Sequence, residues 1–143
     1  MTTIRRTVSV DRPLAKVFDY LSDFTTTNEW DPGTVETVRV SGDGGVGTTY
    51  RNTSQFGGRK TELTYVVERV EPQHVFALRG ENKTVVAHDT MTFRETPTGT
   101  EVTYVAEFEF KGLVKYVAPL LGPAFKKLGD EAQQGMREAL ERL

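Results

Sequence analysis

The sequence contains no cysteine among its 143 residues and only two histidines. A chain without cysteine cannot form disulfides, thiolate nucleophiles, iron–sulfur clusters or cysteine-based zinc sites. A catalytic triad or a three-histidine metal centre needs more partners than two histidines supply. We therefore predict neither a metal site nor a cofactor, and carboxylates and tyrosines remain as the candidate groups for proton transfer.

The chain also lacks an excess of charge of either sign, with 18 Lys and Arg against 20 Asp and Glu. Nucleic-acid-binding proteins usually carry a basic excess or a basic stripe, so we predict no nucleic-acid partner. No apolar run approaches the roughly 18 residues that a membrane-spanning helix needs, and we predict no integral membrane segment. Arg5 and Arg6 are not followed by the apolar stretch of a signal peptide, so a cytoplasmic location is expected.

The length suits one domain over residues 1–143, since domains have about 150 residues on average. Seven segments have the composition of β-strands, being rich in Val, Thr, Tyr and Phe. Short turns separate the last six, which favours antiparallel neighbours over helical crossovers. The predicted strands are Thr3–Val10, Thr34–Ser41, Thr48–Phe56, Arg59–Val70, His74–Gly80, Lys83–Glu95 and Thr100–Phe110.

Apolar residues recur at helical spacing after the first strand and again at the C-terminal end. The stripe over Leu14–Leu21 predicts a short helix, and Thr25–Trp30 adds one more helical turn. A long amphipathic helix is predicted over Leu113–Leu143, broken or kinked near Pro119 and Pro123. The terminal helix is the only element long enough to cover a twisted sheet, so we predict an α+β fold in which the curved antiparallel sheet wraps around it.

Several short motifs stand out along the chain, namely Val17–Phe24, Trp30–Pro32, Gly44–Thr48, Asp89–Phe93, Gly99–Tyr104 and Gly112. They resemble those of the START/Bet v 1-like superfamily, and the chain is most similar to its bacterial polyketide cyclase/dehydrase-type group. The resemblance covers essentially the whole chain. It implies a helix-grip fold with a ligand cavity between the sheet and the C-terminal helix. Members range from carriers and receptors to cyclases, so the fold does not choose among these functions.

Asp89 is the candidate catalytic residue, because it shares one parity of its strand with Val85, Met91 and Phe93. On such an apolar face, desolvation would raise the pKa of the carboxyl and suit it to general acid or base catalysis. Alternatively, Asp89 hydrogen-bonds a hydroxyl or pairs with Arg6. A β-bulge would reverse the parity and turn Asp89 to water.

Aromatic side chains on the inward parities of the strands are candidates to bind a ligand, with the tyrosine hydroxyls orienting it. The alternative for each ring is that it fills the core. Trp30 is favoured as a core residue, and the resemblance implies that it also borders the cavity. An adjustable lid is expected from Leu113, Tyr116, Val117 and Leu120. The residues predicted to bind a ligand are Trp30, Tyr50, Phe56, Phe76, Asp89, Met91, Tyr104, Phe108, Tyr116 and Leu120.

The sequence favours a protein that binds a small hydrophobic or aromatic ligand, polyketide-, isoprenoid- or lipid-like, between the sheet and the C-terminal helix. One alternative is a polyketide cyclase/dehydratase-type enzyme in which Asp89 or a tyrosine moves protons in the same cavity. Another is a lipid-delivery or partner-binding module that exposes the apolar segment Leu113–Leu121. A homodimer is left open.

Overall fold

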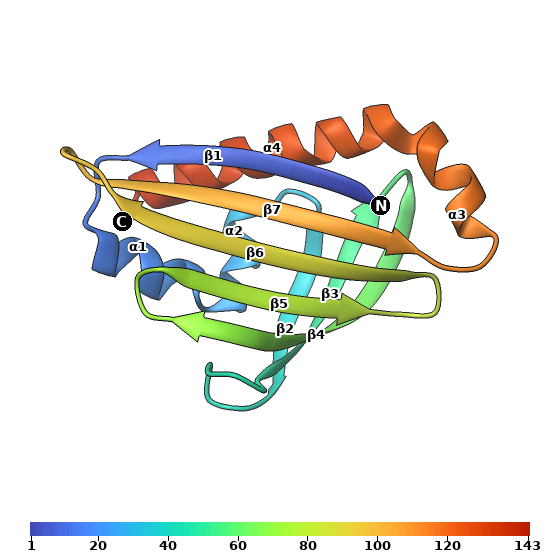
Figure 1. Cartoon of the computed structure of the whole chain (residues 1–143), viewed down its shortest axis with the longest axis horizontal. Helices are drawn as coiled ribbons and strands as arrows, with labels where there is room; N and C mark the ends of the chain where they lie inside the picture. Colours follow the sequence, from blue (N-terminus) through green and yellow to red (C-terminus); the bar gives the residue numbers. More distant parts are fainter.

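The computed structural model describes all 143 residues, and one seven-stranded antiparallel sheet dominates it (Figure 1). The strand order is β1-β7-β6-β5-β4-β3-β2, so the first strand closes against the last and the others form a meander. The predicted fold class is thereby confirmed. The strands are β1 (Thr2–Val10), β2 (Thr34–Ser41), β3 (Thr49–Phe56), β4 (Arg59–Glu71), β5 (Val75–Glu81), β6 (Val85–Glu95) and β7 (Thr100–Phe110).

All seven predicted strands are present, with ends that differ from the prediction by no more than a residue or two. The largest difference is at β6, predicted from Lys83 but beginning at Val85. The side chain of Asn82 accepts hydrogen bonds from the backbone N–H groups of Thr84 and Val85. This side-chain turn occupies the residues that would otherwise extend the strand.

The predicted break in the C-terminal helical segment is also confirmed. Pro119 lies in a short 3₁₀ turn, and Pro123 lies in the first turn of the long helix, where its missing N–H is not needed. None of the helices combines the length and apolar character required to cross a bilayer. The helical elements are α1 (Leu14–Leu21), η1 (Phe24–Thr26), α2 (Thr27–Trp30), α3 (Val114–Val117), η2 (Ala118–Leu121) and α4 (Gly122–Glu141).

The long helix α4 runs alongside β1 over one face of the sheet (Figure 1). A glycine permits the close approach, because a Cβ at Gly129 would lie 2.6 Å from Cγ2 of Ile4. A salt bridge fastens the same contact, since Arg6 Nη2 lies 3.0 Å from Asp130 Oδ1. The helix is therefore held at a fixed height above the edge of the sheet formed by β1.

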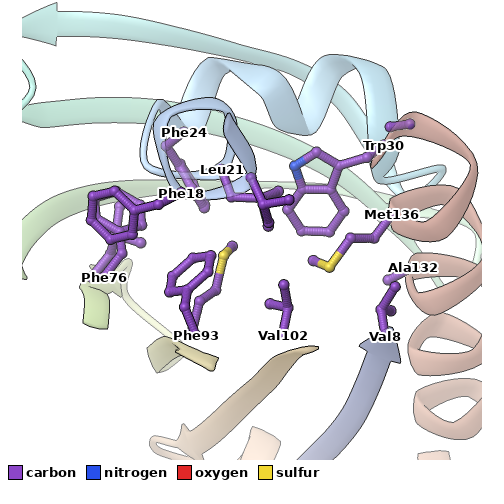
Figure 2. Packing of buried hydrophobic residues seen from close by; sticks show 14 of the residues in the cluster. Val8, Phe18, Leu21, Phe24, Trp30, Phe76, Phe93, Val102, Ala132 and Met136 are labelled. Carbon is purple, nitrogen blue, oxygen red and sulfur yellow. The ribbon is translucent and has the colours of Figure 1, made fainter. Parts of the chain in front are cut away.

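The main core fills the space between α4 and the sheet at the end where α1 and α2 lie. Trp30 and Leu21 descend from the short helical segments towards Val102 of β7, and Met136 reaches in from α4 (Figure 2). Each of these four side chains is at most 1% exposed. The short helices thus act as a plug that closes this end of the fold and leaves no room for a ligand there.

We predict that Gly135→Ala destabilises the protein, although the same change inside a helix normally stabilises by about 1 kcal/mol. A Cβ at Gly135 would lie 2.0 Å from the carbonyl oxygen of Trp30, so α4 and α2 would have to separate. Overpacking of this kind costs about 1–3 kcal/mol, which thermal or urea unfolding would register. Gly122→Ala in the same helix is the matched control, because a Cβ there meets nothing within 4 Å. Equal stability of the two variants would contradict the close packing.

Candidate functional site

A cavity of about 420 Å³ lies between the sheet and the C-terminal helical segments. Its walls come from β1, β3, β4, β6 and β7 on the sheet side and from α3, η2 and α4 on the helical side, and residues of η1 and α2 also line it. The volume falls within the roughly 300–1,000 Å³ that small-molecule sites occupy. The cavity therefore has the size of a ligand site, at the end of the fold that the core leaves unfilled.

The inward-facing residues of β7 show how far the cavity extends. Phe110, Phe108, Ala106 and Tyr104 line it in turn, and the next inward residue, Val102, belongs to the solid core. From Tyr104 to Phe110 the strand advances about 20 Å, at about 3.3 Å per residue. The cavity is thus an elongated space that starts beside α3 and stops at the core plug.

Aromatic rings surround the outer half of the cavity. Phe125 of α4 lies with its ring centroid 4.6 Å from that of Phe56 and 5.4 Å from that of Phe108. Phe110 completes the group, with its centroid 5.8 Å from that of Phe125. Rings at these separations offer both flat faces and edges to an apolar guest, so this half suits a hydrophobic or aromatic group.

The inner end of the cavity is polar and is centred on Asp89, which is only 4% exposed. Its Oδ2 accepts a hydrogen bond of 3.0 Å from the hydroxyl of Tyr104. Its Oδ1 has no hydrogen-bond partner, and no other buried side-chain polar atom of the chain lacks one. The pairing of β6 with β5 and β7 has no register shift, so the bulge that would turn Asp89 to water is absent.

The surroundings of Asp89 raise the pKa of its carboxyl into the physiological range. Burial raises the pKa of Asp89 to about 7, an increase that the Tyr104 hydrogen bond opposes and the nearby Asp31 carboxylate reinforces. The alternative pairing with Arg6 does not occur, because Arg6 reaches Asp130 of α4 instead. Asp89 therefore has a hydroxyl partner but no cationic one.

Tyr65 of β4 lines the same inner end and was not among the residues predicted to bind a ligand. Its ring lies over Gly80 of β5, where a Cβ would be 2.7 Å from the ring. Burial raises the pKa of Tyr65 well above its ordinary value, with no hydrogen bond contributing. The alternation of Thr61, Leu63 and Tyr65 on one parity was the available signal, since all three line the cavity.

A second carboxylate, Asp31, also borders the cavity and was not among the residues predicted to bind a ligand. Its Oδ1 accepts a hydrogen bond from the N–H of Gly33, and its Oδ2 accepts one from the hydroxyl of Thr34. Burial raises the pKa of Asp31, and these hydrogen bonds lower it. Asp31 thus has partners for both oxygens, which distinguishes it from Asp89.

Asn52 of β3 provides a fixed polar patch on the side wall. Its amide nitrogen donates to the hydroxyl of Thr37 at 2.8 Å, and its carbonyl oxygen accepts from Ser54 at 2.7 Å. The Thr37 hydroxyl is in turn hydrogen-bonded to that of Thr27 at 2.6 Å. These groups satisfy one another, so they shape the wall without needing a ligand.

The residues predicted to bind a ligand divide into three groups. Phe56, Asp89, Tyr104 and Phe108 line the cavity. Trp30, Tyr50, Phe76 and Met91 are at most 1% exposed, belong to the main core and do not line the cavity. Trp30 nevertheless touches the site indirectly, because its ring packs edge-on against Tyr104 at 5.7 Å between centroids.

Tyr116 and Leu120 form the third group and lie on α3 and η2 with exposed fractions of 69% and 78%. Val117, which was also expected in the lid, lines the cavity together with Val114 and Leu121. The segment does border the site, but it is rotated so that the predicted residues face outward. The spacing of three and four residues between the lining positions is the helical signal that identifies the inner face.

We predict that the stability of the protein depends on pH through Asp89. The folded-state pKa of about 7 exceeds the unfolded value of about 3.9, so the folded protein keeps a proton that the unfolded chain releases. This contribution to stability is present below about pH 4 and is lost as the pH rises to 7, by about 4 kcal/mol in total at 1.36 kcal/mol per pKa unit.

Asp89→Asn removes the titrating group while preserving its shape. The free energy of unfolding of this variant, measured by urea denaturation, should rise relative to wild type as the pH increases from about 5 to about 8. Other ionisable groups cancel in that difference. Parallel stability curves for the two proteins would contradict a buried, proton-binding Asp89.

The sequence matches the family described as "Polyketide cyclase / dehydrase and lipid transport" over residues 1–143. No curated protein shows significant similarity to the sequence. Among solved structures, the Zhui aromatase/cyclase from Streptomyces sp. R1128 superposes with a TM-score of 0.84 at 15% identity, covering 99% of this chain and 94% of that chain. A START superfamily protein from Mycobacterium smegmatis gives a TM-score of 0.80 at 12% identity, covering 98% and 97% of the two chains.

A third structure, from Thermus thermophilus, gives a TM-score of 0.79 at 16% identity, with 97% of each chain covered. At such low identities these likenesses show a shared fold, whereas the family match rests on the sequence itself. Since that match spans the whole chain, the protein belongs to the family described as polyketide cyclase/dehydrase and lipid transport.

Proposed function

We propose that the protein binds a small hydrophobic or aromatic molecule, polyketide-, isoprenoid- or lipid-like, in the cavity between the sheet and α4. The observation that carries this proposal is a space of about 420 Å³ with an aromatic outer half and a polar inner end. The family description, which names polyketide chemistry and lipid transport, supports the same class of ligand.

The walls of the cavity offer mainly hydrophobic surface, so affinity would come from apolar burial. A ligand that removes about 300 Å² of apolar surface from water gains about 7 kcal/mol, before the cost of association is subtracted. The fixed polar groups at the inner end would set the orientation of the ligand more than its affinity.

The outer rim supports entry from the side of α3. Leu113, Tyr116 and Leu120 expose apolar surface there, next to Val117 and Leu121, which line the cavity. Exposed apolar side chains beside a cavity are typical of a binding groove or its rim. A hydrophobic molecule that enters on this side would meet apolar side chains at the rim.

A cyclisation or dehydration reaction in the same cavity is the second candidate function, and Asp89 favours it. A carboxyl whose pKa lies near 7 can accept and return a proton at physiological pH. Such a reaction would require the ligand to reach the unpartnered Oδ1 of Asp89.

Thr61→Trp should block binding, because Thr61 of β4 lines the cavity and an indole there would occupy the ligand space. The neutral dye N-phenyl-1-naphthylamine, excited directly, gains fluorescence when it enters an apolar cavity. We expect Thr61→Trp to weaken dye binding by about tenfold or more, since tenfold corresponds to only 1.4 kcal/mol.

Thr64→Trp is the matched control, because Thr64 lies on the same strand but on its exposed face. This variant should bind the dye as wild type does. Circular dichroism would verify that both variants are folded. If the two substitutions left dye binding equally unchanged, the ligand would bind elsewhere and the proposed function would be wrong.

A further inference from the structure

The inner end of the cavity contains a carboxyl oxygen that nothing in the protein satisfies. Asp89 Oδ1 is buried and unpartnered, in a chain whose other buried side-chain polar atoms all have hydrogen bonds. A buried polar atom without a partner costs about 1–3 kcal/mol. Such an atom at the end of a ligand cavity indicates that its partner is supplied from the cavity.

The hydrogen bond from Tyr104 determines what Oδ1 can offer. Because the Tyr104 hydroxyl donates to Oδ2, the proton of a neutral Asp89 belongs on Oδ1. The hydroxyl of Tyr65, which also borders the cavity, has no hydrogen bond within the protein and can donate as well. Two O–H donors are therefore available at the same end of the cavity.

We propose that Asp89 and Tyr65 form a hydrogen-bonding site for a neutral carbonyl oxygen, so that the protein selects ligands carrying a ketone or quinone group. This inference rests on the proposed function, because it assigns the orientation of the ligand in that cavity. The carbonyl oxygen lies at the inner end, and the apolar body of the ligand lies among the phenylalanine rings of the outer half.

A neutral carbonyl fits the charges of the site better than an ionic group does. At the inner end, an anionic group would approach the carboxyl groups of both Asp31 and Asp89, whereas Arg59, a cationic residue of the lining, lies at the start of β4, six residues before Tyr65. A cationic ligand would have to lose its hydration and ionise Asp89. The attraction within a single buried ion pair does not offset these two costs. A carbonyl oxygen needs only donors, and its two lone pairs match the two hydroxyl groups.

Packing holds both donors in place before a ligand arrives. The ring of Tyr104, which fixes Asp89, is braced edge-on by the buried Trp30. The ring of Tyr65 occupies the space left by Gly80 and packs against Phe24 at 4.8 Å between centroids. A site prepared in this way loses little conformational entropy when it binds.

The protonation of Asp89 should make recognition depend on pH. The ionisable groups that face it are Tyr104 of β7, Tyr65 of β4 and Asp31 after α2. The paired residue on β5 is Leu78, and α4 presents uncharged residues to the cavity. The pKa values of Tyr65 and Tyr104 are both raised, so the two phenols keep their protons near neutral pH. Of the three O–H groups, only that of Asp89 loses its proton there.

The test compares three flat molecules of nearly equal size: fluorene, fluorenone, which adds a carbonyl, and fluorenol, which adds a hydroxyl. Equilibrium dialysis against wild-type protein should show fluorenone binding about tenfold more tightly than fluorene at about pH 5. The advantage of the ketone should shrink at about pH 9, where Asp89 has lost its proton, whereas fluorene binding should not change with pH.

Variants at Asp89 separate hydrogen bonding from simple shape. In Asp89→Asn, the Tyr104 hydroxyl selects the amide oxygen, so the amide nitrogen points its donors into the cavity. This variant should keep the preference for the ketone and lose its pH dependence. Asp89→Leu should lose the preference while still binding fluorene, and Tyr65→Phe should reduce the preference in part.

Equal binding of fluorene and fluorenone at about pH 5, or tighter binding of fluorenol than of the ketone, would overturn the carbonyl site and leave the proposed cavity function standing. A ketone preference that Asp89→Leu retains would overturn it too. Failure of all three molecules and of N-phenyl-1-naphthylamine to bind would instead overturn the proposed function, and the carbonyl site with it.

Discussion

The close packing of α4 against β1 and α2 is the constraint on which the rest of the structure depends. Gly129 lets the helix approach Ile4, and Gly135 lets it approach the backbone of Trp30, at distances that no side chain would permit. These contacts fix the helix above the sheet at one end. Between the core and α3, the side chains of the sheet and the helical segments leave a space open. The cavity is thus a geometric consequence of where the helix is held.

The same arrangement accounts for the division of the cavity into a polar and an aromatic half. The polar half lies next to the core plug. There the ring of Tyr104 packs against Trp30, and the ring of Tyr65 lies over Gly80. The burial that these neighbours impose keeps Asp89 neutral up to about pH 7 and leaves one of its oxygens unsatisfied. Buried polar groups that lower the stability of a protein are typical of sites that act on a ligand.

Sequence patterns predicted the fold well because alternation and helical periodicity are local properties. The parity of β6 was enough to place Asp89 on the inward face. Parity does not, however, tell how far along a strand the core extends. For that reason Tyr50, Phe76 and Met91 were predicted to bind a ligand although they lie in the core, and Tyr65 was not predicted although it borders the cavity. That boundary is set by how deeply the short helices after β1 penetrate, which is a tertiary property.

Two further differences have the same origin in tertiary packing. Arg6 was weighed as a partner for Asp89, but the nearness of α4 gives it Asp130 instead. Tyr116 was expected to face the ligand, but the break between α3 and α4 turns it outward and turns Val117 inward. The rotation of a one-turn helix depends on how it joins its neighbours, and a single sequence contains little information on that.

The central claim is that a ligand occupies the space between the sheet and α4, and nuclear magnetic resonance tests it most directly. Intermolecular nuclear Overhauser effects would be measured between N-phenyl-1-naphthylamine and the assigned side chains of the protein. The account predicts contacts to Leu63, Phe108 and Ala132, which line the cavity from three different elements. Contacts confined to the exposed Leu113 and Tyr116, with none to the cavity walls, would contradict it.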